Sequence, residues 1–398
     1  MRPSPAATAP LLTPEFQLLL TCVRWPKDAS LAAMTRDQAA LVTDWPRFMA
    51  LVQRHRVSGL THHALVTSGV APPPRIAAAL AAQSRDSAVH EVSSVGETIQ
   101  LVRRLRAAGV DAAVLKGATV ALLAFGRFGV RYSVDIDLMV DRADVGAASS
   151  VLRQLGYVRT EPPETVSDGK MSARMRRNKD LAFENPAKGM KVELHWRLFQ
   201  NPCLMGDVDM TSFRPSALTP GETVMALSMD IAPLYLLVHG AEHAWSRLKW
   251  LADAGALLRS ETAMAERLYR QAKALGLARS VGPGILLSAE LLGTSVPDEL
   301  TDDLRRDWRM RWLLDTARDS LIGDQQGTEL EDTPFATTRK NLGHYLASDD
   351  PRYWFCEARF DLLDEAPLGQ AQQPLVSRVW RRARSLTGML MGSRAVSR

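Results

Sequence analysis

Two aspartates stand inside an otherwise apolar segment, YSVDIDLMV over residues 132–140. The β-branched and apolar residues of this segment predict a strand. Because side chains alternate along a strand, Asp135 and Asp137 face one way, while the apolar residues between and beside them face the other. Such a strand can simply carry a solvated face. Two carboxylates on one face also suit divalent magnesium, which takes hard oxygen ligands together with substrate phosphates.

The neighbouring segments favour the metal over the solvated face. Lys116-Gly117 ends a predicted strand over residues 110–115 and opens a helix at Ala118-Thr119. A tight turn of this kind can hold a phosphate at a helix N-terminus through its backbone N–H groups and the lysine. A later hairpin joins residues 181–184 to 190–196 through turn residues, and Glu193 in its second strand offers a third carboxylate.

The periodicity of the apolar residues predicts an α+β fold in which helical regions flank a small mixed-sheet unit. Helical spacing covers the chain up to Gly109, including one long helix over residues 75–106, and returns from Glu222 onward. The acidic residues 298–303 are interpreted as a turn between helices. The predicted domains are a helical region at 1–106, the α/β unit at 107–200, a helical domain at 201–330 and a helical extension with a basic tail at 331–398.

Composition sets limits on the class of protein. Of 398 residues, 46% are hydrophobic and 23% charged, which excludes a largely disordered or collagenous chain. The net charge of +5 is too small to identify a nucleic-acid or membrane-surface protein. Three widely spaced cysteines indicate neither a disulfide framework nor a cysteine zinc site. No segment approaches the roughly 20 apolar residues of a membrane span, and we expect a cytoplasmic protein.

Three segments, in this order, carry a family resemblance: VLKGATVALLAFGRFGVRYSVDIDLMV, KVELHWRL and LLVHGAEHAWSRLKWLADAGALL. They resemble the uncharacterised bacterial nucleotidyltransferase family of the DNA polymerase β-like nucleotidyltransferase superfamily, over about Asp44 to Leu300. The resemblance implies a polymerase β-like unit in which Asp135 and Asp137 bind divalent metal, with Glu193 as the third ligand. It also implies an NTP as co-substrate and transfer to an acceptor hydroxyl.

The chain departs from the superfamily at the first helix, where Lys116-Gly117-Ala118-Thr119 stands in place of the usual Gly-Ser. Thr119 could supply a hydroxyl there, so Lys116, Gly117 and Thr119 are the candidate nucleotide-binding residues. Arg131 precedes the aspartates and is either a phosphate contact or an ordinary solvated arginine. A basic run is either a solvated loop or a contact for a triphosphate or an anionic acceptor, and it comprises Arg174, Arg176, Arg177 and Lys179.

His239-Gly240-Ala241-Glu242-His243 matches the H-x-x-E-H pattern of inverted zinc peptidases. Such a site needs a third ligand, and Glu329 and Glu331 lie in a segment without supporting pattern. The resemblance instead assigns this segment to the following helical domain. There the polar residues line the cleft opposite the metals or pack as satisfied polar groups: His239, His243, Lys249 and Asp253. Trp245 and Trp250 have the helical spacing of core residues.

These observations predict a nucleotidyltransferase that uses Mg²⁺ or Mn²⁺. It would move an NMP from an NTP such as ATP to a hydroxyl of a small molecule or protein, and it would release pyrophosphate. The alternative is a non-catalytic module that binds a nucleotide or a partner on the same fold. An RNA terminal transferase would require a broad basic surface, which the even mixing of charges disfavours. The basic tail at 375–398 is interpreted as a frayed, solvated terminus.

Overall fold

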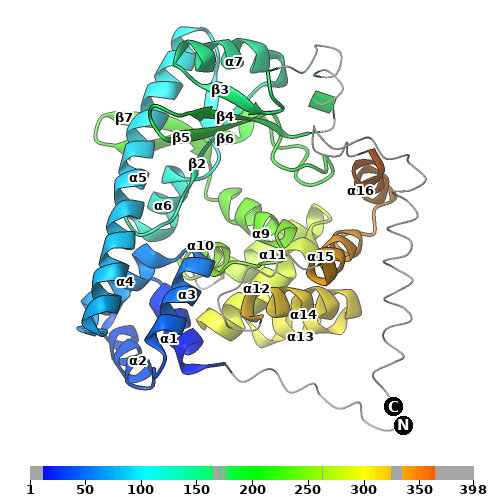
Figure 1. The fold of residues 1–398 in the computed structure, drawn as a ribbon. Helices are drawn as coiled ribbons and strands as arrows, with labels where there is room; N and C mark the ends of the chain where they lie inside the picture. The colour runs from blue at the N-terminus through cyan, green and yellow to red at the C-terminus, as the bar shows by residue number, and fades with distance from the viewer. Residues whose placement is uncertain are drawn as a thin grey trace.

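The computed structural model describes residues 12–164, 171, 175–176, 178–261, 263–323 and 334–363 (Figure 1). It confirms the α+β class. In this part of the chain one sheet has the strand order β3-β4-β5-β2-β1-β7-β6. The strands are β1 Ala112–Val114, β2 Asp135–Val140, β3 Val158–Glu161, β4 Asp180–Asn185, β5 Met190–His195, β6 Phe213–Thr219 and β7 Glu222–Leu227.

The two central strands place the carboxylates on one face of the sheet. β2 and β5 run parallel, and their register sets Asp137 opposite Glu193. The alternate residues Ile136 and Val192 belong to a core between the sheet and helices α5 and α7. Met139 lies two residues after Asp137 and on the same face of β2, and it belongs to the core of the helical regions. The acidic face of the sheet therefore looks toward the helical domain, as the period-2 pattern predicted.

The sheet extends beyond the segment 107–200 that the sequence assigned to it. β6 and β7 form an antiparallel hairpin, and β7 pairs in parallel with β1 through Val114 and Ala226. The expectation that helical structure returns at Glu222 is therefore wrong for residues 222–227. The turn between the strands contains Pro220 and Gly221, whose φ of 82° is favourable only for a residue without a Cβ. The hairpin covers β1, which would otherwise be an edge of the sheet.

A long helix connects the amino-terminal helices to the sheet. α5, Pro74–Ala107, has 34 residues and runs along one side of the molecule (Figure 1). Proline at its first position and Gly109 at φ 75° beyond its end match the expected start and stop. Its carboxyl half covers the sheet through Leu101 and Leu105. The preceding helices are α1 Pro14–Val23, α2 Ala29–Ala40, α3 Trp45–His55 and α4 Ser58–Thr67.

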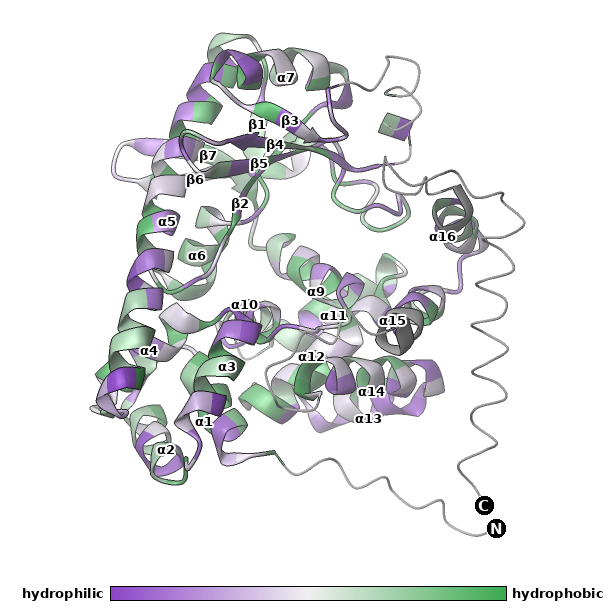
Figure 2. Ribbon diagram, viewed as in Figure 1, coloured by the Kyte–Doolittle hydropathy of each residue, from purple (hydrophilic) through white to green (hydrophobic). Residues whose placement is uncertain are grey.

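Helices also follow and accompany the strands. Those within the sheet unit are α6 Ala118–Phe125 and α7 Val145–Gln154. Those of the carboxyl-terminal domain are α9 Ala232–Glu242, α10 Leu248–Leu258, α11 Met264–Ala274, α12 Ala278–Leu292, α13 Asp298–Arg306, α14 Trp308–Ile322, α15 Pro334–Leu346 and α16 Pro351–Leu363. Figure 2 shows that hydrophilic residues dominate α13, at the outer edge of this domain.

The acidic segment at 298–303 is helical, not a turn. Asp298 and Glu299 occupy the first turn of α13, where negative charge is favourable to the helix dipole. Leu300 and Leu304 bury the inner face of the helix. No helix of the described residues is long and apolar enough to cross a membrane. The predicted basic tail lies outside the described residues.

Candidate functional site

The carboxylates of β2 and β5 meet at the centre of the sheet. The Asp137 side chain has no exposed surface, while those of Asp135 and Glu193 are about a quarter and a third exposed. The cluster of three carboxylates is therefore buried at Asp137 and reaches solvent at Asp135 and Glu193. A ligand can approach Asp135 and Glu193 without disturbing the core.

His195 joins this group from the end of β5. Its Nε2 lies 3.2 Å from Asp137 Oδ1 and 3.3 Å from Glu193 Oε2. Possible ligand atoms of Asp137, Glu193 and His195 all lie within 4.8 Å of one another, close enough to hold one metal ion. Because side chains alternate along β5, His195 shares the face of Glu193, and no sequence motif assigns it a role. Asp135 lies on the same face outside this group of three.

The Lys116 ammonium group offsets the carboxylates. Its Nζ lies 2.9 Å from Asp137 Oδ1 and 3.7 Å from Asp135 Oδ2. Burial lowers the pKa of Lys116, but the attraction of Asp137 and Asp135 outweighs it, and the pKa lies well above its usual value. The lysine that was expected to face phosphates is thus bonded to the proposed metal ligands.

The pKa values of Asp137 and Glu193 shift in opposite directions. Burial raises the pKa of Asp137, and the opposing attraction of Lys116 does not reverse this. Burial acts in the same direction on Glu193, but the bond from His195 and the charge of Lys116 hold its pKa well below the usual range. Burial lowers the pKa of His195, and its bonds to the two carboxylates more than compensate and raise it.

The donor set fits a divalent cation. Asp137 Oδ2 is buried and has no hydrogen-bond partner within the described part of the chain, which is costly for a carboxylate oxygen. Carboxylate oxygens suit magnesium and manganese, and an imidazole nitrogen extends the choice to softer transition metals. A cation beside Asp137 and Glu193 would coordinate Asp137 Oδ2 and offset the negative charge of the two carboxylates.

A second lysine lies beside the group. Lys179 Nζ is 2.9 Å from Asp180 Oδ2, and Asp180 pairs with His195 across the β4–β5 ladder. Burial lowers the pKa of Lys179, but Asp180 and Glu193 raise it further than burial lowers it. Of the predicted basic run, Arg176 and Lys179 belong to the described residues, while Arg174 and Arg177 lie outside them.

The turn before α6 is held by backbone geometry and by Arg131. Gly117 has φ 72° and ψ −120°, a conformation that requires glycine. Arg131 is buried, and its Nη1 lies 3.4 Å from the Gly117 carbonyl oxygen while Nε and Nη2 bond to Asp253 at 3.0 Å. It is therefore not the solvated arginine considered from the sequence. Thr119 Oγ1 bonds to the Lys116 carbonyl oxygen at 3.4 Å, within the same turn.

The helical domain contributes an aromatic wall from α9 and α10. The rings of His243 and Trp250 stack at 4.5 Å, and the ring of His239 meets that of His243 edge-on at 4.8 Å. Burial lowers the pKa of both histidines well below the usual value, and nearby lysines add to this. Lys249 Nζ lies 5.7 Å from the Trp250 ring centre and 5.8 Å from that of Tyr132. Burial, followed by repulsion from Arg131 and Lys116, lowers the pKa of Lys249 to about 7.

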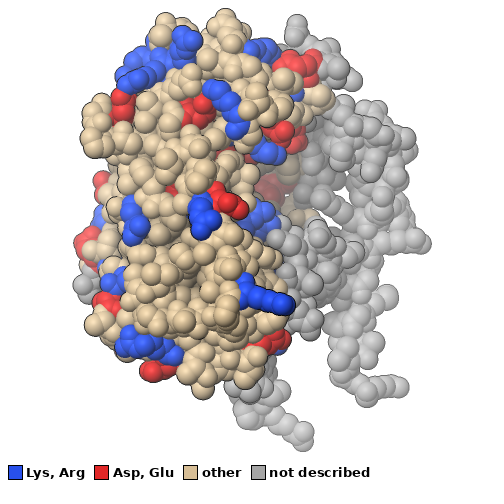
Figure 3. All heavy atoms as spheres, turned by 60° about the vertical axis from the view of Figure 1, so that its left-hand side comes forward, with Lys and Arg blue, Asp and Glu red and all other residues tan. Residues whose placement is uncertain are grey.

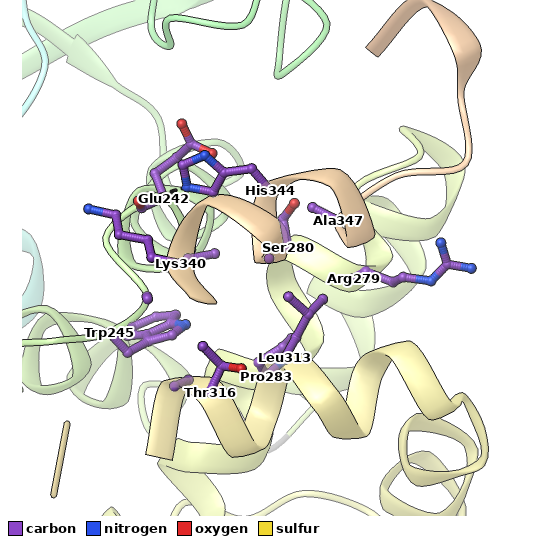
Figure 4. Close-up of a pocket in the computed structure, with 14 residues that line it drawn as sticks. Glu242, Trp245, Arg279, Ser280, Pro283, Leu313, Thr316, Lys340, His344 and Ala347 are labelled. Atoms are coloured by element: carbon purple, nitrogen blue, oxygen red, sulfur yellow. Dashed lines mark hydrogen bonds between the residues drawn. The ribbon is translucent and has the colours of Figure 1, made fainter. Parts of the chain in front are cut away.

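The H-x-x-E-H pattern does not form a zinc site in the described part of the chain. The acidic group on β2 and β5 is the one candidate metal cluster found among those residues, and Glu329 and Glu331 lie outside them. Glu242 helps to line a separate pocket between α9, α12, α14 and α15 (Figure 4). His344 Nε2 lies 3.2 Å from the Glu242 carbonyl oxygen. Trp245 is fully buried, as its spacing predicted.

The chain matches one of the known protein-family models. The family model described as "Uncharacterised nucleotidyltransferase" matches residues 42–293, which is more than half of the chain. The matched segment contains the strands, α5 and the aromatic wall. No curated protein matches the chain.

Proposed function

The chain belongs to the uncharacterised nucleotidyltransferase family, and from this premise we propose that it transfers an NMP from an NTP to an acceptor hydroxyl and releases pyrophosphate. The observation that carries the proposal is the register of β2 and β5, which sets Asp137 against Glu193 with Asp135 on the same face. This is the arrangement that a divalent cation and a triphosphate require.

Asp135, Asp137 and Glu193 are the proposed metal ligands, and Mg²⁺ or Mn²⁺ are the proposed ions. The ion would neutralise the phosphates and polarise the α-phosphorus when bound. His195 Nε2 bridges Asp137 and Glu193, so it either ligates the ion or fixes the two carboxylates in position.

Lys116 and Lys179 supply positive charge on two sides of the carboxylates. Both ammonium groups bond to carboxylates, and each could exchange that partner for a phosphate oxygen. Gly117 lets the backbone turn sharply before α6, and we assign the first N–H groups of this helix to an anionic phosphate. We assign Arg131 to the support of this turn through Asp253.

An RNA acceptor receives no support from the face of the molecule that Figure 3 shows. On the face turned forward in Figure 3, Lys and Arg alternate with Asp and Glu in small groups. Nucleic-acid binding relies on a continuous basic surface. We therefore propose a small-molecule or protein acceptor.

The test combines binding with transfer. Thermal stability of the purified chain is measured with each NTP, with and without Mg²⁺ or Mn²⁺, and α-labelled NTPs are then added to a cell extract. We expect one NTP to raise the melting temperature only with metal, and the chain to label an extract component. A non-catalytic module would bind the NTP equally well with and without divalent metal, and Asp137→Asn would not weaken that binding. Labelling that persists in Asp137→Asn and Glu193→Gln would refute the proposed reaction.

A further inference from the structure

A second cavity lies at the end of the same sheet, beyond His195. Three arginines line it, Arg176, Arg197 and Arg359, together with Gln200, Pro202 and Phe360. Neither Asp135 nor Asp137 lines this cavity, and it is separate from the pocket of Figure 4. Its charge is opposite to that of the acidic group.

β5 links the cavity to the acidic group. Arg197 follows His195 by two residues, or about 7 Å at the usual rise of a strand. Its Nη2 donates to the carbonyl oxygens of Asn178 at 2.6 Å and Arg176 at 3.3 Å. These bonds fix the guanidinium group, while its buried Nε has no hydrogen-bond partner among the described residues. A donor held in this way can bond to an acceptor on a ligand.

α16 closes the other side of the cavity. Asn201, which follows Arg197 by four residues, donates from Nδ2 to Glu357 Oε2 at 2.8 Å and to the Tyr353 carbonyl oxygen at 3.1 Å. This pair of bonds holds α16 against the segment after β5. Arg359 and Phe360 are thereby brought to the cavity from a helix more than 150 residues away in sequence.

No carboxylate of the described residues lies within ion-pair distance of the three arginines, and Asp180 attracts Arg197 only from farther away. Among the described residues, none of them forms an ion pair, whereas Lys116, Lys179 and Arg131 each bond to an aspartate. Burial and the neighbouring charges of Arg142 and Arg359 lower the pKa of Arg197. Grouped guanidinium groups without a counter-ion are unfavourable unless an anion joins them.

We propose that this arginine cavity binds a phosphate group on the acceptor substrate, so that the acceptor is a hydroxyl compound that also carries a phosphate. The inference rests on the proposed function. Planar guanidinium forks match phosphate oxygens in pairs, and three such groups suit a dianion better than a single carboxylate. The phosphate would anchor the acceptor at the end of β5 with its hydroxyl directed along the sheet toward Glu193.

The test titrates the full chain with inorganic phosphate by calorimetry in buffer without divalent metal. We expect Arg359→Met and Arg176→Met, both exposed side chains, to weaken phosphate binding about tenfold or more, since each removes a charge-assisted contact. The control is Arg352→Met, an exposed arginine of α16 outside the cavity, and it should change the affinity less than twofold. Unchanged phosphate binding in both cavity variants would overturn the inference.

A second titration with a non-hydrolysable NTP and Mn²⁺ separates the acceptor from the nucleotide. Arg359→Met should bind the nucleotide as the wild type does, while Asp137→Asn should not bind it. If Arg359→Met loses nucleotide and phosphate together, the cavity holds the triphosphate and the acceptor assignment is wrong. If the wild type binds no nucleotide with metal, the proposed function fails, and the phosphate titration still reports on the cavity.

Discussion

Arg131 and Asp253 form a buried, bidentate ion pair that joins the sheet unit to the helical domain. Nε and Nη2 of the arginine bond to the carboxylate at 3.0 Å. The arginine follows α6 and the aspartate lies in α10, 122 residues later. Because Nη1 also reaches the Gly117 carbonyl oxygen, this pair couples the position of α10 to the turn at the candidate site.

Breaking this pair should destabilise the fold. Arg131→Met leaves the Asp253 charge buried and alone, which costs about 3–5 kcal/mol. Urea unfolding measures this loss. The double variant Arg131→Met/Asp253→Leu should recover most of it, because no unpaired charge remains. Equal losses in the single and double variants would show that the ion pair is not the source of the effect.

The turn at Gly117 should not accept a side chain. Its backbone angles are those of glycine, so Gly117→Ala should cost about 1–3 kcal/mol of stability. It should also weaken nucleotide binding by more than the loss of folded protein explains. The matched control is Gly146→Ala in α7, where an added Cβ meets nothing within 4 Å and where alanine favours the helix by about 0.5–1 kcal/mol. A Gly117→Ala variant as stable as the wild type would refute the assigned conformation.

His344 should make the stability of the helical domain depend on pH. Burial lowers its pKa, but Glu242 and Glu357 outweigh burial and raise it to about 9. Its Nδ1 lies 3.1 Å from Glu357 Oε1. Since the folded pKa exceeds the unfolded value of about 6.5, the charged pair contributes fully below about pH 6.5 and is lost as the pH rises through 9.

The expected contribution of this pair is about 3 kcal/mol. Urea unfolding at pH 6 and pH 9.5 should show the wild type losing stability over this interval. His344→Gln keeps an amide in place of the imidazole and should lose much less. An equal decline in both proteins would show that another group carries the pH dependence.

The period-2 patterns of β2 and β5 predicted both the carboxylate face and its third member, because alternation depends on the local chain alone. Alternation along β5 also explains why His195 lies on that face. Its bonds to Asp137 and Glu193 depend on the register between two strands, which no single segment encodes.

The differences between the predicted and the observed structure have physical causes. The apolar residues of β7 form a run too short to distinguish a strand from a helix, and only the Pro220-Gly221 turn indicates a hairpin. The acidic residues of α13 suit both a turn and the first turn of a helix, so their type alone does not predict the helix. The ion pair of Arg131 could not be predicted, since its partner is 122 residues distant. Lys116 was assigned to phosphates because its chemistry suits them, and its bond to Asp137 appears only in three dimensions.

Asp137 and Glu193 are proposed to hold a divalent cation to which an NTP binds. The most direct measurement is calorimetric titration of the chain with Mn²⁺, followed by a non-hydrolysable NTP, in wild type, Asp137→Asn, Glu193→Gln and the exposed control Asp141→Asn. We predict that the wild type and Asp141→Asn bind metal and then nucleotide, and that Asp137→Asn and Glu193→Gln, while folded, lose both by at least tenfold. Metal and nucleotide binding of wild-type strength in folded Asp137→Asn and Glu193→Gln would contradict the account.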